Sequence, residues 1–296
     1  MKRKKNRKKR HVFLLFLFSF FLWGAGYYYY KEVEKKKKDD HFNITSIIQT
    51  GLEKEVLKTA YLAELMDLSV DLPTNLYLFD CKKARKWLLA SPLIKEAKVK
   101  KMPPQTIYVD YSVRQPIAWV VDYENIAIDE DGYLFPVSPF LSPKHLPQIF
   151  LGIALEEKEK IDWNFSIQEK NFSLAQKLLH IFAQPEIKKL FLVKWIDTSA
   201  VSLASYGKRE IIVLLENEMR IKQQEKEKIF LFPHLLRLNV THFQEQLGNY
   251  LVLREKMLFD YKKQLTKTDI SKDFVHFKTK VIDLRIEKLA FVDEKF

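Results

Sequence analysis

The hydrophobic and polar positions of the amino-terminal part fall into three blocks. Eight of the first ten residues are Lys or Arg, and the run 12–30 carries no charge. In a helix this run reaches ~28 Å, close to the ~30 Å hydrocarbon core of a bilayer. Residues 31–41 hold a single apolar side chain, Val33, as is typical of a solvated linker. The pattern predicts a basic tail over 1–11, a transmembrane helix over 12–30 and a linker over 31–41.

The charges that flank this segment predict its direction. Eight Lys or Arg residues precede it and five follow it, and the side richer in these residues normally stays in the cytoplasm. We therefore expect a single-pass protein of the cytoplasmic (inner) membrane, with residues 31–296 on the periplasmic or extracytoplasmic side. A cleaved signal peptide is the alternative, because Gly24 and Gly26 could mark a cleavage site. Nucleic-acid binding by the tail is disfavoured, because the tail has no aromatic residue that could stack on a base.

Residues 42–113 show a mixed periodicity. Ile107, Val109 and Tyr111 alternate with polar residues, as in a half-buried strand. Asp80 precedes a stretch with one apolar face, as a helix N-cap does. The predicted order is strand 42–48, helix 53–66, helix 81–90, strand 94–101 and strand 106–113. Two helices on one face of a three-stranded sheet would enclose a small core.

Residues 114–292 are richer in short strands. The Asp131-Gly132 pair predicts a hairpin turn, and 217–232 resembles an insertion between two strands. The alternation of apolar and charged residues within 281–287 predicts a last strand. Further strands are predicted over 117–122, 126–128, 133–137, 190–196, 200–206, 210–216 and 235–240, with helices over 173–182 and 241–264. The fold class is therefore α+β, with a β-rich second domain over 114–292 and a tail over 293–296.

Composition narrows the function classes. The net charge of +12 comes mostly from the tail; without its eight bases the excess is four, so no basic domain is present that would bind nucleic acid. The single cysteine, Cys81, excludes an intramolecular disulfide framework and a cysteine-rich metal site.

Motifs for catalysis are missing from the sequence. The seven histidines form no metal-binding pair, and we expect them at the surface or with satisfied hydrogen bonds. Residues 129–132 resemble the start of a calcium loop, but their glycine comes too early, so a hairpin turn is favoured. No nucleophile elbow or phosphate loop occurs. We therefore predict no catalytic residue, no metal, no cofactor and no small-molecule substrate.

Several short stretches occur in a recognisable order. They are NLYLF (75–79), IKEAKV (94–99), PQTI (104–107), RQPIA (114–118), ID…GYLF (128–135) and IDLR (282–285). With these stretches the chain resembles the FtsQ family of division proteins, called DivIB in some bacteria. The resemblance implies a POTRA domain over 42–113 and an FtsQ-type β domain over 114–292. Ile286 stands where the family has an aromatic contact residue, and Val113 stands where it often has Glu.

The resemblance implies a non-enzymatic divisome scaffold. Such proteins bind the small bitopic proteins FtsB and FtsL and help control septal peptidoglycan synthesis at the division site. The implied partner-binding residues are Leu284, Arg285, Ile286 and Arg209. A last strand at a sheet edge would offer its backbone to a partner strand, and Arg285 could contact a partner carboxylate.

Alternatives stay open at this point. Arg285 could instead be an ordinary surface charge paired with Asp283 or Glu287. The chain could be another POTRA-type protein, one that handles clients in transport or outer-membrane assembly. An anchored cell-wall enzyme would need a catalytic set that the motifs do not supply.

Overall fold

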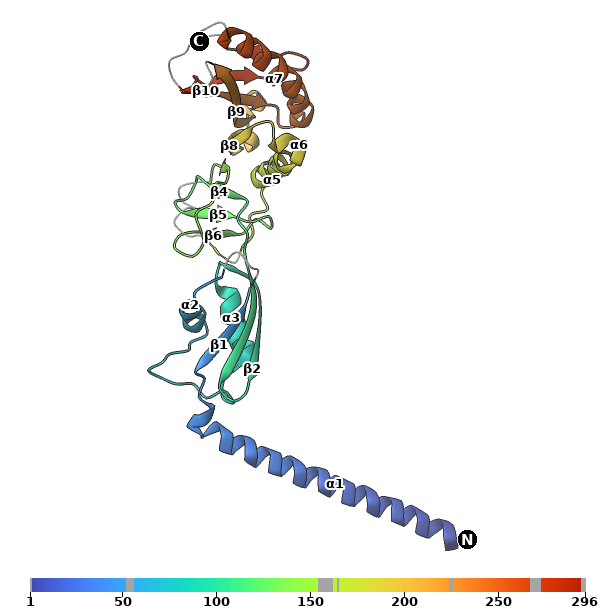
Figure 1. Ribbon diagram of the computed structural model, residues 1–296. Coiled ribbons are helices and arrows are strands. Elements are labelled where there is room, and N and C mark those ends of the chain that lie inside the picture. Colours follow the sequence, from blue (N-terminus) through green and yellow to red (C-terminus); the bar gives the residue numbers. More distant parts are fainter. Residues whose placement is uncertain are drawn as a thin grey trace. The chain divides into compact units, whose positions relative to one another are not determined.

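A computed structural model describes the chain except residues 1, 52–55, 154–161, 164, 224–225, 267–272 and 294–296. The chain divides into two compact units, Met1–Val113 and Arg114–Phe296 (Figure 1). Each unit combines helices with a sheet, so the predicted α+β class holds for both.

The first helix, α1, covers Lys2–Lys37. Across the described residues, no helix has both the length and the apolar character that a membrane crossing requires. The predicted transmembrane helix over 12–30, and the inner-membrane localisation built on it, are therefore wrong. The physical reason lies in the run itself: only its first 12 residues, 12–23, are strongly apolar. They reach ~18 Å of the ~30 Å required, and the small residues and tyrosine hydroxyls that follow are not hydrocarbon.

The first unit continues with a short 3-10 helix, Asp40–Phe42, and then a three-stranded sheet. The sheet order is β1-β3-β2, with β1 parallel to β3 and β2 antiparallel to it. The order of elements is the predicted strand, helix, helix, strand, strand. Their bounds are β1 Ser46–Thr50, α2 Thr59–Leu65, α3 Cys81–Ala90, β2 Ile94–Met102 and β3 Thr106–Val113.

Helix α3 begins where the sequence predicts it to begin. The Asp80 carboxylate accepts hydrogen bonds from the amides of Lys82 (2.8 Å) and Lys83 (3.2 Å). These bonds lower the pKa of Asp80, the bond from Lys83 contributing most, because they stabilise the charged carboxylate. The helix buries Ala84 and Leu88 and packs on β2, and β3 buries every second residue.

The second unit is built on a ten-stranded mixed sheet. Its order is β13-β12-β10-β9-β8-β7-β4-β5-β6, and β11 also pairs with β10. The strands are β4 Ala118–Val120, β5 Ile126–Ile128, β6 Leu134–Pro136, β7 Gln148–Phe150, β8 Leu192–Asp197, β9 Ile211–Gln223, β10 Lys226–Leu238, β11 Phe274–His276, β12 Lys280–Asp283 and β13 Phe291–Val292. The helices are α5 Lys170–Ala183, α6 Pro185–Lys188 and α7 Phe243–Leu265.

Two predictions for this unit are wrong in an informative way. Residues 217–232 are not an insertion. Strands β9 and β10 are antiparallel and pair along their whole length, from Ile211 opposite Leu238 to Gln223 opposite Lys226. The predicted strand 200–206 is instead covered by two 3-10 turns, Ser199–Ser202 and Tyr206–Lys208. The Asp131-Gly132 turn is confirmed: β5 and β6 are antiparallel, and Gly132 has φ +84°, which glycine adopts readily.

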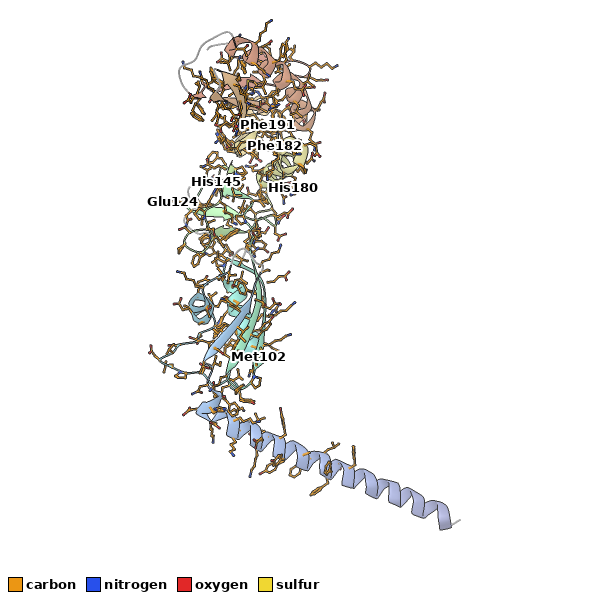
Figure 2. All side chains as sticks on the ribbon, viewed as in Figure 1. Met102, Glu124, His145, His180, Phe182 and Phe191 are labelled. Carbon is orange, nitrogen blue, oxygen red and sulfur yellow. The ribbon has the colours of Figure 1, made fainter. Side chains whose placement is uncertain are left out.

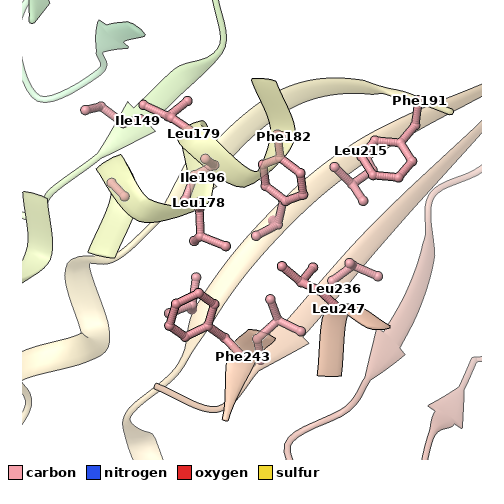
Figure 3. Close-up of a cluster of buried hydrophobic side chains, with 14 of the residues drawn as sticks. Ile149, Leu178, Leu179, Phe182, Phe191, Ile196, Leu215, Leu236, Phe243 and Leu247 are labelled. Atoms are coloured by element: carbon pink, nitrogen blue, oxygen red, sulfur yellow. The ribbon is translucent and has the colours of Figure 1, made fainter. Parts of the chain in front are cut away.

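The core of the second unit lies between the sheet and the helices α5 and α7. Along β9, Ile211, Val213 and Leu215 are fully buried, because alternate residues of a strand share one face. Phe182 of α5 meets Phe191 edge to face, with ring centroids 5.8 Å apart (Figure 2). Figure 3 shows these rings among the aliphatic side chains of the cluster.

Candidate functional site

The predicted partner-binding residues Leu284, Arg285 and Ile286 lie just after β12. This strand ends at Asp283, and the chain turns back so that Asp283 pairs with Phe291 of β13. The prediction of a strand that continues to residue 287 is therefore wrong. The Asp283 carboxylate accepts the amide hydrogen of Arg285 at 3.1 Å, and such a local bond takes the backbone out of the ladder. We call residues 280–292 the β12–β13 hairpin.

This hairpin changes which strand is outermost. β12 lies between β10 and β13, while β13 is the last strand on that side among those that the structure describes. The expectation that the strand preceding Arg285 forms the edge is therefore wrong. Only two residues, Phe291 and Val292, form the outer strand.

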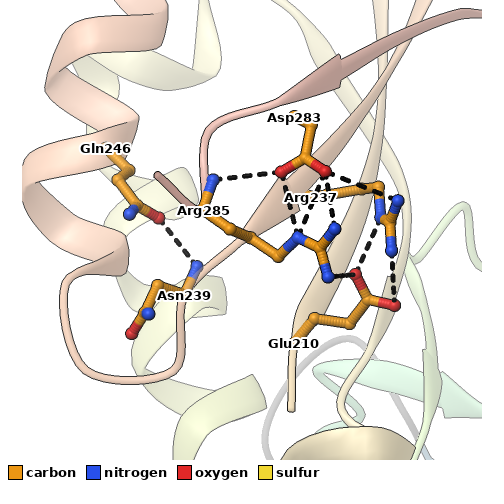
Figure 4. Close-up of polar contacts among 6 residues, drawn as sticks. All are labelled: Glu210, Arg237, Asn239, Gln246, Asp283 and Arg285. Carbon is orange, nitrogen blue, oxygen red and sulfur yellow. Dashed lines mark hydrogen bonds and ion pairs between the residues drawn. The ribbon is translucent and has the colours of Figure 1, made fainter. Parts of the chain in front are cut away.

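Arg285 belongs to a group of four charged side chains, which we call the hairpin ion cluster (Figure 4). Its Nη2 lies 2.7 Å from Asp283 Oδ2 and its Nη1 lies 3.2 Å from Glu210 Oε2. Arg237 joins the same two acids, at 2.8 Å from Glu210 Oε2 and 3.4 Å from Asp283 Oδ2. Two cations and two anions alternate, so their formal charges cancel.

The cluster sets the ionisation of its members. Burial by itself would raise the pKa of Asp283, but the hydrogen bonds and the charge of Arg285, together with the charge of Arg237, outweigh burial and lower it. The hydrogen bond to Asp283 is the main reason that the pKa of Arg285 is raised. Arg285 is thus paired with Asp283, as expected if it were an ordinary surface charge, and Glu210 is its second partner.

The apolar side chains of the hairpin divide into two groups. Leu284 is 3% exposed and belongs to the core, and its amide donates to the carbonyl of Arg237. Ile286, Leu289 and Phe291 are 54%, 56% and 57% exposed. These last three, which we call the apolar rim, place hydrophobic surface beside the outer strand, and exposed apolar surface of this kind is typical of interaction sites.

A groove of about 550 Å³ runs between the hairpin and the first turns of α7. One wall is residues 284–290. The opposite wall includes polar groups of α7, and Gln246 Oε1 holds the amide of Asn239 at 2.7 Å. The wall residues include Asn239, His242, Glu245, Asn249 and Leu253. The groove therefore joins a polar helix face to the apolar rim.

Arg209, the fourth predicted contact residue, makes different contacts. Its guanidinium lies 4.1 Å from the centre of the Tyr206 ring, and its Nε donates to the carbonyl of Leu203. The neighbouring Glu210 joins the ion cluster instead. Sequence reasoning missed Glu210 and Arg237, because only the strand register reveals that Arg237 pairs with Asp283 across β10 and β12.

The described part of the chain holds no group of three or more His, Cys, Asp or Glu side chains placed to bind a metal ion. The hairpin itself offers backbone, apolar rim and paired charges. Such an arrangement can bind a polypeptide segment.

No protein-family model matches the chain, and no curated protein matches it.

Proposed function

We propose that the chain is a non-enzymatic scaffold of the cell-division machinery, whose second unit binds small FtsB-like and FtsL-like proteins. By holding these partners it would help control septal peptidoglycan synthesis. The observation that carries the proposal is the β12–β13 hairpin, where an outer strand, an apolar rim and a groove occur together. The division role rests on the resemblance of the ordered motifs to the FtsQ family.

The outer strand supplies the first part of the interface. β13 pairs with β12 on one side, and its other side is the open side of the sheet in the described part of the chain. An extended partner segment can add to such a strand through backbone hydrogen bonds, while side-chain contacts supply specificity. The short length of β13 fits a natural edge, because long open edges promote aggregation.

The apolar rim supplies the second part. Ile286 is one of the predicted contact residues and is more than half exposed. A few well-packed residues near the centre of an interface usually carry most of the binding free energy. A coiled-coil partner, with apolar residues on one helix face and an extended segment beyond it, could cover Ile286, Leu289 and Phe291 at once.

Arg285 has a positioning role in this proposal. Its guanidinium spans Asp283 and Glu210, so it ties the turn that carries Ile286 to the start of β9. A partner carboxylate near the cluster would compete with acids already present. We therefore assign direct contact to Ile286 and the rim, and support of the turn to Arg285.

The test is site-specific photo-crosslinking in the cells that make the protein, with captured proteins identified by mass spectrometry. The photo-reactive residue replaces Ile286 in one strain and Phe291 in another. Val121 is the matched control, since it is 51% exposed and lies next to β4 in the same unit. We expect small coiled-coil division proteins from the two hairpin positions, at least tenfold enriched over Val121.

Three results would separate the functions. Equal capture from Val121 would remove the hairpin as the site. Unfolded envelope proteins in place of coiled-coil partners would favour the alternative, a POTRA-type protein that handles clients. Capture from position 291 that survives Ile286→Glu together with Leu289→Glu, in a protein that still folds, would show that the rim is not the contact surface.

A further inference from the structure

A second feature of the same unit is a cavity that meets the β12–β13 hairpin only at Lys280. β11 pairs with residues 229–231 of β10, and β12 pairs with residues 234–237. Between these stretches β10 has Phe232 and Pro233, and residues 277–279 join β11 to β12 without strand pairing, although the Phe277 amide donates to the Leu231 carbonyl. Pro233 has no amide hydrogen, so the gap leaves no donor unpaired at that residue. A cavity of about 400 Å³ lies there, against the last turns of α7.

One wall of the cavity includes His234, which is fully buried. Its Nδ1 lies 2.9 Å from the Tyr250 hydroxyl and 3.2 Å from the Asn217 side-chain nitrogen. An amide nitrogen can only donate, so Nδ1 is the acceptor and the proton of the neutral ring is on Nε2. Among the described residues Nε2 has no hydrogen-bond partner. The expectation that every histidine is at the surface or satisfied is wrong for His234.

The ring stays neutral at physiological pH. Burial, and then the charges of Arg254 and Lys280, lower the pKa of His234 to about 4. Nδ1 faces Tyr250 and Asn217, so Nε2–H lies on the opposite edge of a ring that belongs to the cavity lining. A buried donor without an acceptor is costly in free energy, and such groups call for an explanation such as a bound ligand or water.

Three aromatic rings belong to the other walls. Tyr261 and Phe277 each stack on Phe232, with ring centroids 4.6 Å apart in both pairs. The ammonium of Lys280 lies 5.4 Å from the centre of the Tyr261 ring, and Lys278 also lines the cavity. The volume falls within the range of ordinary ligand pockets, which combine apolar walls with a few placed polar groups.

We propose that this cavity binds a small planar carboxylate. The ring of the ligand lies against the aromatic walls, one of its carboxylate oxygens accepts the hydrogen of His234 Nε2, and Lys280 compensates the negative charge. No other buried side chain lining this cavity combines an unpartnered donor with a nearby cation. This site shares Lys280, the first residue of β12, with the β12–β13 hairpin, and it includes none of the proposed partner-binding residues.

The experiment uses the full chain labelled with ¹⁵N-histidine and the probe 2-naphthoate. We expect saturable binding that shifts the Nε2 resonance of His234 and leaves that of His145 unchanged, because His145 does not line this cavity. The neutral analogue 2-naphthalenemethanol should bind more weakly. An Nε2 resonance unmoved by millimolar 2-naphthoate would overturn the proposal and leave a bound water as the partner of His234.

A variant pair sharpens the test. Lys280→Gln should weaken 2-naphthoate binding at least fivefold and change the affinity for 2-naphthalenemethanol by less than twofold. Lys194→Gln is the control, since Lys194 is an exposed residue of β8 that pairs with Glu216. Equal losses in the two variants, or no loss in Lys280→Gln, would contradict the assigned role of the ammonium. Both variants alter exposed or half-exposed lysines, so folding should be retained.

Discussion

Two polar clusters of the second unit lie on opposite faces of one strand. Arg237 of β10 belongs to the hairpin ion cluster, while His234, three residues earlier, belongs to a buried network with Asn217, Tyr250 and Arg254. An odd spacing places two strand residues on opposite faces. The outer cluster balances two cations against two anions near solvent. The inner network surrounds one guanidinium with neutral groups, so it is far more sensitive to the loss of a member.

Arg254 shows this sensitivity most clearly. It is 8% exposed, its Nε donates to Asn217 Oδ1 at 2.5 Å, and its Nη2 donates to the carbonyl of Leu190. Burial is the main reason that its pKa is lowered. The network therefore contains a partly desolvated charge that depends on its acceptors.

The largest effect is expected for Arg254→Leu. Loss of the guanidinium leaves the buried Asn217 oxygen without this donor and also removes the partly buried bond to the Leu190 carbonyl, which should lower the free energy of unfolding by about 4 kcal/mol. Urea denaturation followed by circular dichroism measures this loss. Lys256→Leu is the control, because Lys256 is exposed on the same helix. A loss below ~1 kcal/mol in Arg254→Leu would show that the network is not essential to the core.

The pH dependence of stability should come next in size. The pKa of His234 is about 4 in the folded chain, against ~6.5 in an unfolded one. Between these values the unfolded state binds more protons, so the free energy of unfolding falls as the pH falls from ~6.5 to ~4, by about 3 kcal/mol. Above ~6.5 this contribution is constant.

Urea denaturation at a series of pH values between 6.5 and 4.5 measures this slope. His234→Asn should remove most of the slope, whatever its effect on stability at neutral pH. A slope that persists in the variant would assign it to another group. Histidine NMR supplies a direct check, because the imidazole of His234 should remain neutral at pH 5.

The local elements could be predicted better than their pairing. The alternation at Ile107, Val109 and Tyr111, the Asp80 cap and the Asp131-Gly132 turn depend on neighbouring residues, and each occurs in the structure. The end of β12 could not be predicted, because it depends on a side chain that competes with the ladder. The membrane segment was mispredicted because tyrosines and glycines were counted as apolar length.

The candidate site was predictable only in part. Arg285 could be singled out from the sequence through the family resemblance, but its partner Glu210 could not, because Glu210 precedes β9, Arg285 follows β12, and the two meet only in the folded chain. No sequence pattern marked His234 as a candidate site residue either. A histidine in an apolar strand is common, and its unsatisfied nitrogen follows from the positions of Asn217 and Tyr250.

The smallest effect is expected for Arg285→Gln. The Arg285 side chain is 26% exposed, and ion pairs near solvent contribute little, so the free energy of unfolding should fall by less than about 1 kcal/mol. The pKa of Asp283 should rise toward its usual value, because hydrogen bonds and charge from Arg285 lower it in the native chain. Since that lowering stabilises the fold only above the unfolded pKa of Asp, the variant should lose less stability than the native chain as the pH falls below ~4. Urea denaturation at pH 7 and pH 3 measures both quantities.

If support of the turn is the role of Arg285, crosslinking from Ile286 should weaken in Arg285→Gln by more than this small loss of stability explains. A loss of stability comparable to that of Arg254→Leu would instead place the outer cluster with the inner network, and the contrast between the two faces of β10 would not hold.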